Sequence, residues 1–271
     1  MSLLLIAISL LPVVLLLVFI YRQDKYEKEP VGLLIRAFVG GMVAIPLDLT
    51  LVSLINTVFY SESVFFTAFI EAGFCEELCK FVILFLTIWW NRNFNEHMDG
   101  IVYATFVGLG FACVENVLYV MQAASTDLAA GFSTGIVRAL LSVPGHFLFA
   151  IVMGYFLSLA KFSEQRRFGF LLLCLFAPAL IHGLFDWLLM AGDIIHPALA
   201  LVLLALFIWG DIRLWKLGIR LIRRHQENSP FKGQANNDAP QAEAPPINSM
   251  SNPYSNEPEY KHIDWDAGNK Y

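Results

Sequence analysis

The sequence predicts an all-α protein: a polytopic membrane helical bundle of about seven transmembrane helices, followed by a disordered C-terminal tail. Of the 271 residues, 57% are hydrophobic and only 15% are charged, whereas soluble domains average about 45–50% apolar and about 25% charged residues. Seven stretches are also long and apolar enough to cross a bilayer as helices, which takes about 20 residues. The surplus apolar surface must face lipid, because a soluble domain of this size could not bury it.

The seven predicted membrane spans follow one another with short loops between them. The second span is long and contains Gly40, Gly41 and Pro46, so it forms either one kinked helix or a helix followed by a re-entrant piece. The first span has the length of a signal peptide, but no Lys or Arg precedes Tyr21, and signal peptides need a basic start. The spans are 2–20, 31–60, 64–90, 100–121, 132–160, 168–190 and 197–212.

Lysine and arginine lie in alternate loops, and the loops between them, 61–63, 123–131 and 191–196, contain none. Cytoplasmic loops carry the excess of these residues, so seven spans place the N-terminus outside and the C-terminus in the cytoplasm. The net charge of −5 argues against a nucleic-acid partner, which would need a basic face. The basic residues of these loops and of the segment directly after the last span are Arg22, Lys25, Lys28, Arg92, Lys161, Arg166, Arg167, Arg213, Lys216, Arg220, Arg223 and Arg224.

The last part of the chain has a different composition. Residues 226–271 are rich in Asn, Pro, Ala, Glu and Gln and poor in large aliphatic side chains. Such a segment cannot bury enough apolar surface to offset the entropy lost on ordering. The sequence therefore predicts a transmembrane domain over residues 1–225 and a disordered cytoplasmic tail over residues 226–271.

A set of polar and charged residues lies inside the predicted spans. Each charged side chain at the centre of a membrane helix costs about 2.5–3.5 kcal/mol on insertion scales. A mere anchor would not carry that cost, and such residues normally turn inward, pair and mark a functional site. The set comprises Glu76, Glu77, Lys80, Glu115, Asn116, Arg138, His146, His182 and Asp186.

The spacing of these residues indicates that they meet. Glu76 and Glu77 precede Lys80 by four and three residues, so one helix face holds two acids and a cation. His182 and Asp186 are also four residues apart, which lets the carboxylate orient the imidazole. Counted from the outer ends of their spans, Glu76, Glu115, His146 and His182 lie at a depth of about 12–21 Å. We expect them to line one polar pocket.

This set contains more acids than bases. Its four carboxyl groups accompany two permanent cations, Lys80 and Arg138. Surplus carboxylates cannot all stay ionised in a medium of low dielectric constant. A carboxyl group that keeps its proton or a histidine that becomes charged would make an acid/base pair, whereas a bound divalent metal would make a metal-hydrolase site. The spacing leaves these possibilities open.

Three motifs in this set resemble those of the PrsW family of intramembrane proteases. Residues 76–80 (EELCK) are similar to the family's EExxK motif, residues 111–116 (FACVEN) to FxxxEN, and residues 182–186 (HGLFD) to HxxxD. The loop with Tyr26, Glu27, Glu29 and Pro30, the segment 96–103 and the stretch from Arg138 to His146 are also similar to that family. The resemblance covers about residues 21–224, and three motifs in order on separate spans make it specific.

The resemblance implies a multi-pass protease of the bacterial inner membrane, related to the type II CAAX prenyl endopeptidases. Its implied role is to start regulated proteolysis by cutting a membrane-anchored anti-sigma factor on the extracytoplasmic side. Whether the reaction uses a metal or a metal-free glutamate mechanism does not follow from the resemblance. The expected partners are this protein substrate and the lipid bilayer.

Peptide hydrolysis needs an activated water, a stabilised oxyanion and a proton for the leaving amine. We expect Glu76 or Glu77 to be the general base, with Lys80 acting against the rise in its pKa that burial causes. His182, oriented by Asp186, would bind the water or donate to the oxyanion, and the Asn116 amide offers a further donor.

Glu115 could help to hold the water, and His146 is a further ligand or donor. If a metal is bound, His146, His182 and one of Glu77 or Glu115 form a chemically sensible zinc set. Two other classes of protein remain as alternatives. Intramembrane carboxylates and histidines also build proton-coupled transporters, although no inverted repeat supports this class, and a catalytically silent scaffold or sensor could recruit partners through the tail.

Overall fold

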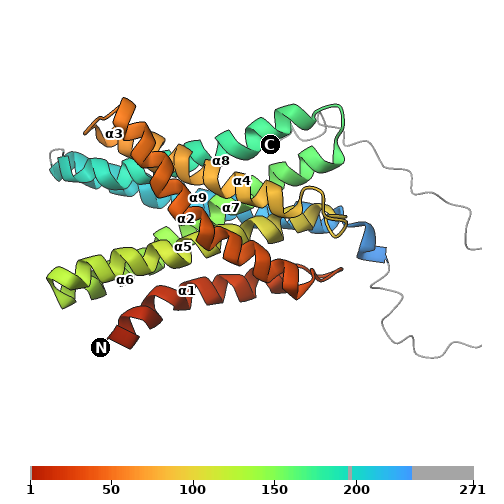
Figure 1. Cartoon of the computed structure of the whole chain (residues 1–271), viewed down its shortest axis with the longest axis horizontal. Coiled ribbons are helices and arrows are strands. Elements are labelled where there is room, and N and C mark those ends of the chain that lie inside the picture. The colour runs from red at the N-terminus through yellow and green to blue at the C-terminus, as the bar shows by residue number, and fades with distance from the viewer. Residues whose placement is uncertain (1, 195–196, 234–271) are drawn as a thin grey trace, which may run out of the picture. The chain divides into compact units, whose positions relative to one another are not determined.

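The computed structural model describes residues 2–194 and 197–233, and within these ranges every regular element is a helix. Figure 1 shows how the long helices pack alongside one another. They are α1 (Ser2–Gln23), α2 (Val31–Val58), α4 (Glu77–Ile88), α5 (His97–Thr126), α6 (Leu128–Leu140), α7 (Ser142–Phe162), α8 (Arg167–Met190) and α9 (Pro197–Glu227). The short elements are α3 (Val64–Phe66), the π-helix η1 (Thr67–Glu76) and the 3-10 helices η2 (Ala191–Ile194) and η3 (Pro230–Gly233).

Five helical stretches are long and apolar enough to cross a membrane: Leu3–Gln23, Val31–Val58, His97–Thr126, Leu128–Phe162 and Arg167–Met190. Two more of the expected spans are also helical. Residues 64–88 are divided among α3, η1 and α4, and residues 197–212 form the first half of α9. The predicted all-α membrane bundle is therefore confirmed, and its helix count agrees approximately with the seven expected.

Prolines affect the second and the fifth of the expected spans in different ways. The second span forms one continuous helix, α2, with Pro46 inside it, so there is no separate re-entrant piece in this part of the chain. The fifth span is divided into α6 and α7, which meet at Leu141. The cause is Pro144, which lacks a backbone N–H and whose ring would clash with the carbonyl of Leu140 in a continuous helix. Pro144 is instead accommodated in the first turn of α7.

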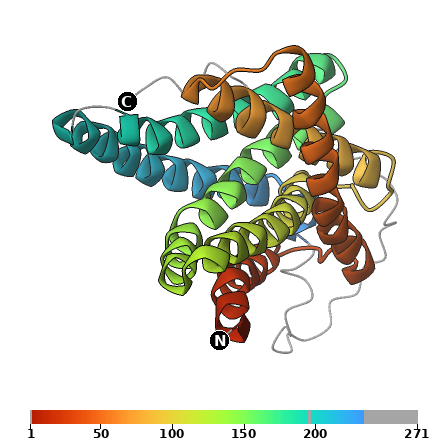
Figure 2. The same ribbon diagram turned by 60° about the vertical axis from the view of Figure 1, so that its left-hand side comes forward.

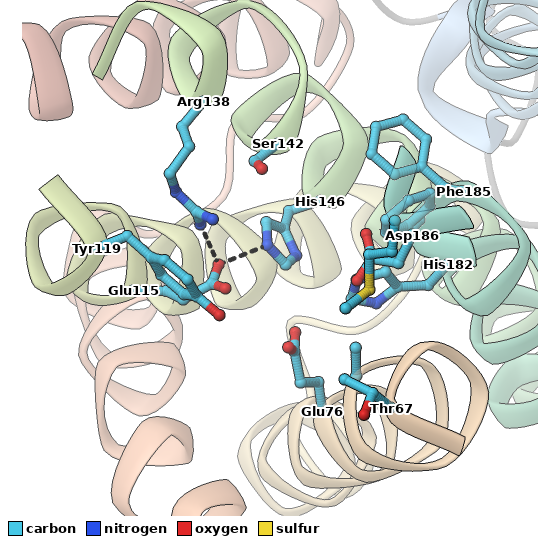
Figure 3. A pocket seen from close by; sticks show the side chains of 13 residues that line it. Thr67, Glu76, Glu115, Tyr119, Arg138, Ser142, His146, His182, Phe185 and Asp186 are labelled. Carbon is cyan, nitrogen blue, oxygen red and sulfur yellow. Dashed lines mark hydrogen bonds and ion pairs between the residues drawn. The ribbon is translucent and has the colours of Figure 1, made fainter. Parts of the chain in front are cut away.

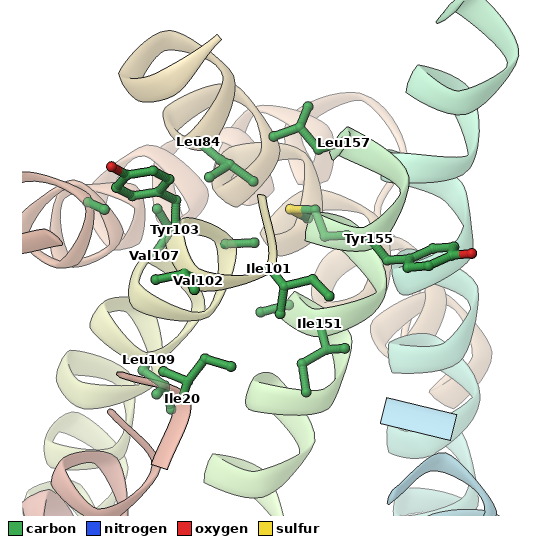
Figure 4. Packing of buried hydrophobic residues seen from close by; sticks show 14 of the residues in the cluster. Ile20, Leu84, Ile101, Val102, Tyr103, Val107, Leu109, Ile151, Tyr155 and Leu157 are labelled. Carbon is green, nitrogen blue, oxygen red and sulfur yellow. The ribbon is translucent and has the colours of Figure 1, made fainter. Parts of the chain in front are cut away.

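Helix α5 is the centre of the bundle. It packs most extensively against α7 and α2 and also contacts α1 and α6, an arrangement that can be followed from a second direction in Figure 2. Figure 4 shows Ile101 of α5 near Ile151 of α7 and Leu109 of α5 near Ile20 of α1, and the same buried cluster includes Leu84 of α4. The outer faces of α1 and α2 expose many large aliphatic side chains, as helices surrounded by lipid do.

Glycines allow α5 to approach its neighbours closely. A Cβ at Gly154 of α7 would overlap the carbonyl oxygen of Gly100 and lie 2.6 Å from Cα of Ile101. A Cβ at Gly41 of α2 would overlap the carbonyl oxygen of Val107 and lie 2.9 Å from the backbone nitrogen of Phe111. Small residues at membrane helix contacts let backbones come together in this way.

The charged loops meet at one end of the bundle, which we call the basic end and define by loops 24–30, 89–96 and 163–166. Asn95 donates to Glu27 over 3.4 Å, and Lys161 donates to the carbonyl oxygen of Trp89 over 2.6 Å. The end of α9 joins them, because Gln226 contacts Gln23 and the Ser229 hydroxyl donates to Glu96. The alternate loops that the sequence places on one side therefore do lie together.

A group of buried acids lies at the basic end. One carboxylate oxygen of Asp99 accepts from the backbone N–H groups of Asn95 and Glu96, and the Tyr103 hydroxyl donates to Glu29. Burial raises the pKa of Asp24 to about 7, while the nearby Lys28 ammonium opposes this shift. Burial also raises the pKa of Glu96 to about 7, while the hydrogen bond from Ser229 opposes it. Both acids lie outside the membrane spans and keep a proton near neutral pH.

The boundary of the predicted tail lies inside an ordered element. Helix α9 continues to Glu227, and Gln226 and Ser229 are 7% and 8% exposed because they pack on the basic end. Residues 226–233 therefore belong to the bundle. The remainder of the predicted tail, 234–271, lies outside the described residues.

We predict that Gly154→Ala destabilises the bundle by about 1–3 kcal/mol, because the added methyl group must push α5 and α7 apart. Thermal unfolding of the purified protein in detergent would measure this as a lowered melting temperature. Gly169→Ala is the matched control, since a Cβ at Gly169 meets no atom within 4 Å. Equal melting temperatures for the two variants would contradict the close packing of α5 against α7.

The acids at the basic end predict a pH dependence of stability. Asp24 and Glu96 have pKa values of about 7 in the fold and near 4 when unfolded. Between about pH 4 and pH 7 the folded chain therefore holds protons that the unfolded chain has released, so stability falls as the pH rises through this range. We expect the melting temperature to fall from about pH 5 to about pH 7.5 and to fall less in the Asp24→Asn/Glu96→Gln variant. The same slope in both proteins would refute this assignment.

Candidate functional site

The π-helix η1 brings an acidic segment against α8. A Cβ at Gly73 would lie 2.6 Å from the carbonyl oxygen of Ala179, and one at Gly183 would lie 2.9 Å from Cγ of Phe69, so only glycine permits this approach. The change from π- to α-helix falls between Glu76 and Glu77. π-Helical segments are rare and frequently occur at functional sites. Here the close packing lets Glu77 reach a side chain of α8.

The Lys80 ammonium is the centre of a buried polar group. Its Nζ lies 3.0 Å from Oε2 of Glu76, 2.8 Å from Oε1 of Glu77 and 3.1 Å from Nδ1 of His146. The same nitrogen lies 4.0 Å from the centre of the Phe111 ring, a cation–π contact. Lys80 is only 2% exposed and Glu77 only 1%. The expected cluster of two acids and a cation is therefore present and buried.

The two imidazoles connect this group to other helices. His182 lies with Nδ1 3.0 Å from Oε1 of Glu77 and with Nε2 3.5 Å from Oδ2 of Asp186. His146 uses Nδ1 toward Lys80 and Nε2 toward Oε2 of Glu115, at 2.8 Å. The two rings are 5.2 Å apart between centroids, nearly perpendicular to each other. Polar groups of η1, α4, α5, α7 and α8 thus form one network.

A cavity of about 110 Å³ lies beside this network. Figure 3 shows Glu76 and Thr67 on one side of it and Glu115 with His146 on the other, with His182 and Asp186 closing a third side. The Arg138 guanidinium pairs with Glu115 at 2.7 Å and stacks 4.1 Å from the centre of the Tyr119 ring. The residues that line the cavity are Thr67, Ala72, Glu76, Glu115, Tyr119, Arg138, Ser142, His146, Phe149, His182, Phe185, Asp186 and Met190.

The structure brings most of the expected site residues to this place. Five of them line the cavity, and Glu77 and Lys80 lie behind it in the same network. Asn116 is different, because it does not line the cavity. Its amide nitrogen donates to the carbonyl oxygen of Ser9 over 2.8 Å, and its oxygen accepts from Nε of Arg138 over 2.9 Å. Asn116 therefore holds α1 and Arg138 in place. The five cavity residues are Glu76, Glu115, His146, His182 and Asp186.

One acidic residue near the site was missed in the sequence. Asp48 of α2 is 8% exposed, and its Oδ1 has no hydrogen-bond partner within the described part of the chain. It lies on the face of α2 that packs against Phe111 of α5 and against Cys79 of α4, which precedes Lys80. The available signal was an aspartate in the middle of an apolar span, which is costly for the same reason as the other intramembrane charges.

The donor set fits a divalent metal. Glu76, Glu77, His146 and His182 each offer one ligand atom, and these atoms lie within 4.8 Å of one another. Imidazole and carboxylate groups are common zinc ligands, and Oε2 of Glu77 is a buried acceptor with no hydrogen-bond partner among the described residues. Glu115, an expected ligand, lies outside this group and instead holds the far nitrogen of His146, as partners of metal-bound histidines often do.

Comparisons with known proteins agree with the motifs. Residues 29–210 match the model of the family described as "PrsW family intramembrane metalloprotease". The chain is similar to Protease PrsW of Geobacillus kaustophilus (strain HTA426), with 35% identity over 236 residues, which are 85% of this chain and 99% of the relative. It is also similar to Protease PrsW of Bacillus subtilis (strain 168), with 38% identity over 192 residues, 69% of this chain and 83% of the relative.

Protease PrsW of Clostridioides difficile (strain 630) is a third relative, with 34% identity over 235 residues, 84% of this chain and 94% of the relative. The search of solved structures finds no match. The family model covers the site from Glu76 to Asp186, and the relatives align along most of their length. The chain therefore belongs to the PrsW family of intramembrane metalloproteases.

Proposed function

We propose that this chain is a membrane-embedded endopeptidase that cuts a membrane-anchored protein with a water activated by glutamate and histidine side chains. The observation that carries this proposal is the cavity of about 110 Å³ lined by Glu76, Glu115, His146, His182 and Asp186. Acids and imidazoles that face one water-sized space can exchange protons with a substrate there. Membership of the family supports the same reaction class.

Glu76 is the better candidate for the general base. It lines the cavity, whereas Glu77 is 1% exposed and already bonded to both Lys80 and His182. A water held between Glu76 and the opposite wall could give its proton to Glu76 as it attacks the peptide carbonyl. Glu77 would then act indirectly by holding His182 and Lys80 in place.

The oxyanion would be stabilised by cavity groups other than Asn116, since both polar atoms of the Asn116 amide are already bonded elsewhere. His182 lines the cavity between Glu77 and Asp186, which together fix its orientation. A protonated imidazole can donate to the oxyanion and then to the leaving amine.

The same group of residues supports a metal-dependent form of the reaction as the alternative, in which Glu76, Glu77, His146 and His182 hold zinc instead of serving as base and proton donor. A zinc ion bound there would supply Lewis-acid polarisation of the peptide carbonyl or of the attacking water. The protein's own part is to fix the four ligands. His146 is held from behind by Glu115 and His182 is held by Asp186.

The placement of the charged loops supports an orientation and a substrate class. The basic end would face the cytoplasm by the positive-inside rule, which puts the N-terminus outside and the C-terminus inside the inner membrane of a bacterium. The sequence resemblance to the family suggests a membrane-anchored anti-sigma factor as the substrate, cut on its extracytoplasmic side.

The test of the function is substitution of the proposed machinery. We expect Glu76→Gln, Glu77→Gln and His182→Ala each to lower cleavage at least about 100-fold, because each removes a group that moves a proton or that holds such a group in place. The measurement is the rate at which a co-expressed membrane-anchored anti-sigma factor of the same bacterium is cut. Membrane levels and gel filtration in detergent would verify that each variant is folded.

Glu71→Gln is the matched control for these variants. Glu71 lies on the same π-helix, but its carboxylate accepts a hydrogen bond of 2.6 Å from Asn56, away from the cavity. It should cut at the wild-type rate. Full cleavage by all three site variants would exclude the proposed mechanism.

A further inference from the structure

Asp48 is a buried acid that the mechanism above does not use. It lies inside the membrane span of α2, is 8% exposed, and has one carboxylate oxygen that is buried with no hydrogen-bond partner in the described ranges. An unpaired carboxylate in this environment is costly and persists only where something compensates for it. The position of Asp48 therefore needs an explanation.

The surroundings of Asp48 connect it to Lys80. One turn earlier on α2, Ala44 and Ile45 pack with Cys79 of α4 and Phe111 of α5, and Lys80 follows Cys79 and stacks on the same Phe111 ring. Asp48 is four residues after Ala44 and three before Leu51, which also packs on this cluster, so it lies on the face of α2 that meets α4 and α5. Lys80 is thus the cation that Asp48 is placed to attract.

Lys80 also lies where it competes with a metal. Its ammonium contacts the side chains of Glu76, Glu77 and His146, which are three of the four possible metal ligands. A divalent cation and an ammonium repel each other, and the ligand atoms cannot serve both at contact distance. Lys80 must therefore turn away when a metal is bound, and its four-carbon side chain is flexible enough to do so.

We propose that Asp48 is a positioning residue that receives the Lys80 ammonium when a divalent cation enters the group of Glu76, Glu77, His146 and His182. Without Asp48, the displaced ammonium would be left unpaired in the bundle, and metal binding would carry that penalty. With Asp48, the metal and Lys80 each have acidic partners. This inference rests on the metal-dependent form of the proposed function.

The charge balance agrees with this assignment. Asp48 adds a fifth carboxylate to those of Glu76, Glu77, Glu115 and Asp186, whereas Lys80 and Arg138 supply the permanent positive charge near them. The surplus of negative charge favours an additional cation. The acids are then divided between two centres: Glu76 and Glu77 with the metal, and Asp48 with Lys80.

The direct test is the affinity for Zn²⁺ of the full chain in detergent, measured by competition with a chromophoric chelator. We expect Asp48→Asn to weaken zinc binding at least about 10-fold, the scale of losses when a group that supports the ligands is removed. Asp48→Glu should restore most of the affinity. Asp211→Asn is the matched control, because Asp211 lies on α9 beside the groove formed by Leu184, Phe207 and Leu214, away from this site.

Two further readouts separate a role through Lys80 from a structural one. Asp48→Asn should not lower the melting temperature of the zinc-free protein, because Oδ1 of Asp48 has no hydrogen bond to lose within the described residues. In a Lys80→Met background, Asp48→Asn should no longer weaken zinc binding, because no ammonium then needs a partner. If Lys80→Met does not fold, the zinc affinities of Asp48→Asn and Asp48→Glu are by themselves the test of the inference.

Wild-type zinc affinity for Asp48→Asn would overturn the inference, as would an equal loss in the Lys80→Met background. Cleavage of the substrate, measured in parallel, separates this failure from failure of the proposed function. A wild-type protein that cuts the substrate but binds no zinc would refute the inference about Asp48 and would still support the proposed protease function. A wild-type protein that binds zinc with the expected dependence on Asp48 but cuts no substrate would refute the function alone.

Discussion

A buried ammonium that needs acidic partners is the constraint on which the site depends. Lys80 is 2% exposed in an apolar bundle, and it is stabilised by Glu76 and Glu77 on its own helical segment. Taking these charges out of water costs several kcal/mol per ion, which only close and well-directed contacts can offset. The helices must therefore hold η1, α4 and α7 in one arrangement, since His146 also lies against Lys80.

The rest of the fold supplies that arrangement. Glycines bring α5 against both α2 and α7, and another pair brings η1 against α8. Asn116 ties α1 to Arg138, and Arg138 in turn pairs with Glu115, which holds His146. The polar group thus rests on contacts with nearly every neighbouring helix, and five of its residues also face the cavity that a substrate would enter.

Much of the fold and of the site could be predicted from the sequence, because the lipid environment restricts which residues a membrane span contains. Long apolar runs predicted the helices, and charged residues inside them predicted a site, since both follow from the energetics of lipid. The spacing of Glu76, Glu77 and Lys80 also predicted their contacts, because residues three and four apart share a helix face. These features depend on local sequence alone.

Other features depend on tertiary packing and could not be predicted in this way. Asn116 follows Glu115 directly, yet it points to a different neighbour because successive residues on a helix face different directions. Which nitrogen of His146 meets Glu115, and which acids join the ligand group, depends on how α5, α7 and α8 cross. The ordered residues 226–233 were missed because polar contacts at the basic end, rather than apolar burial, hold them.

The claim that Lys80 and Glu77 stabilise each other as a buried pair can be measured most directly by a double-mutant cycle on thermal stability. Lys80→Met alone should destabilise the protein by about 3–5 kcal/mol, because it leaves a buried carboxylate without its cation. The Lys80→Met/Glu77→Gln double variant should be more stable than the sum of the two single changes predicts, by at least about 1 kcal/mol. Strict additivity of the two substitutions would contradict the pairing and the account of the site built on it.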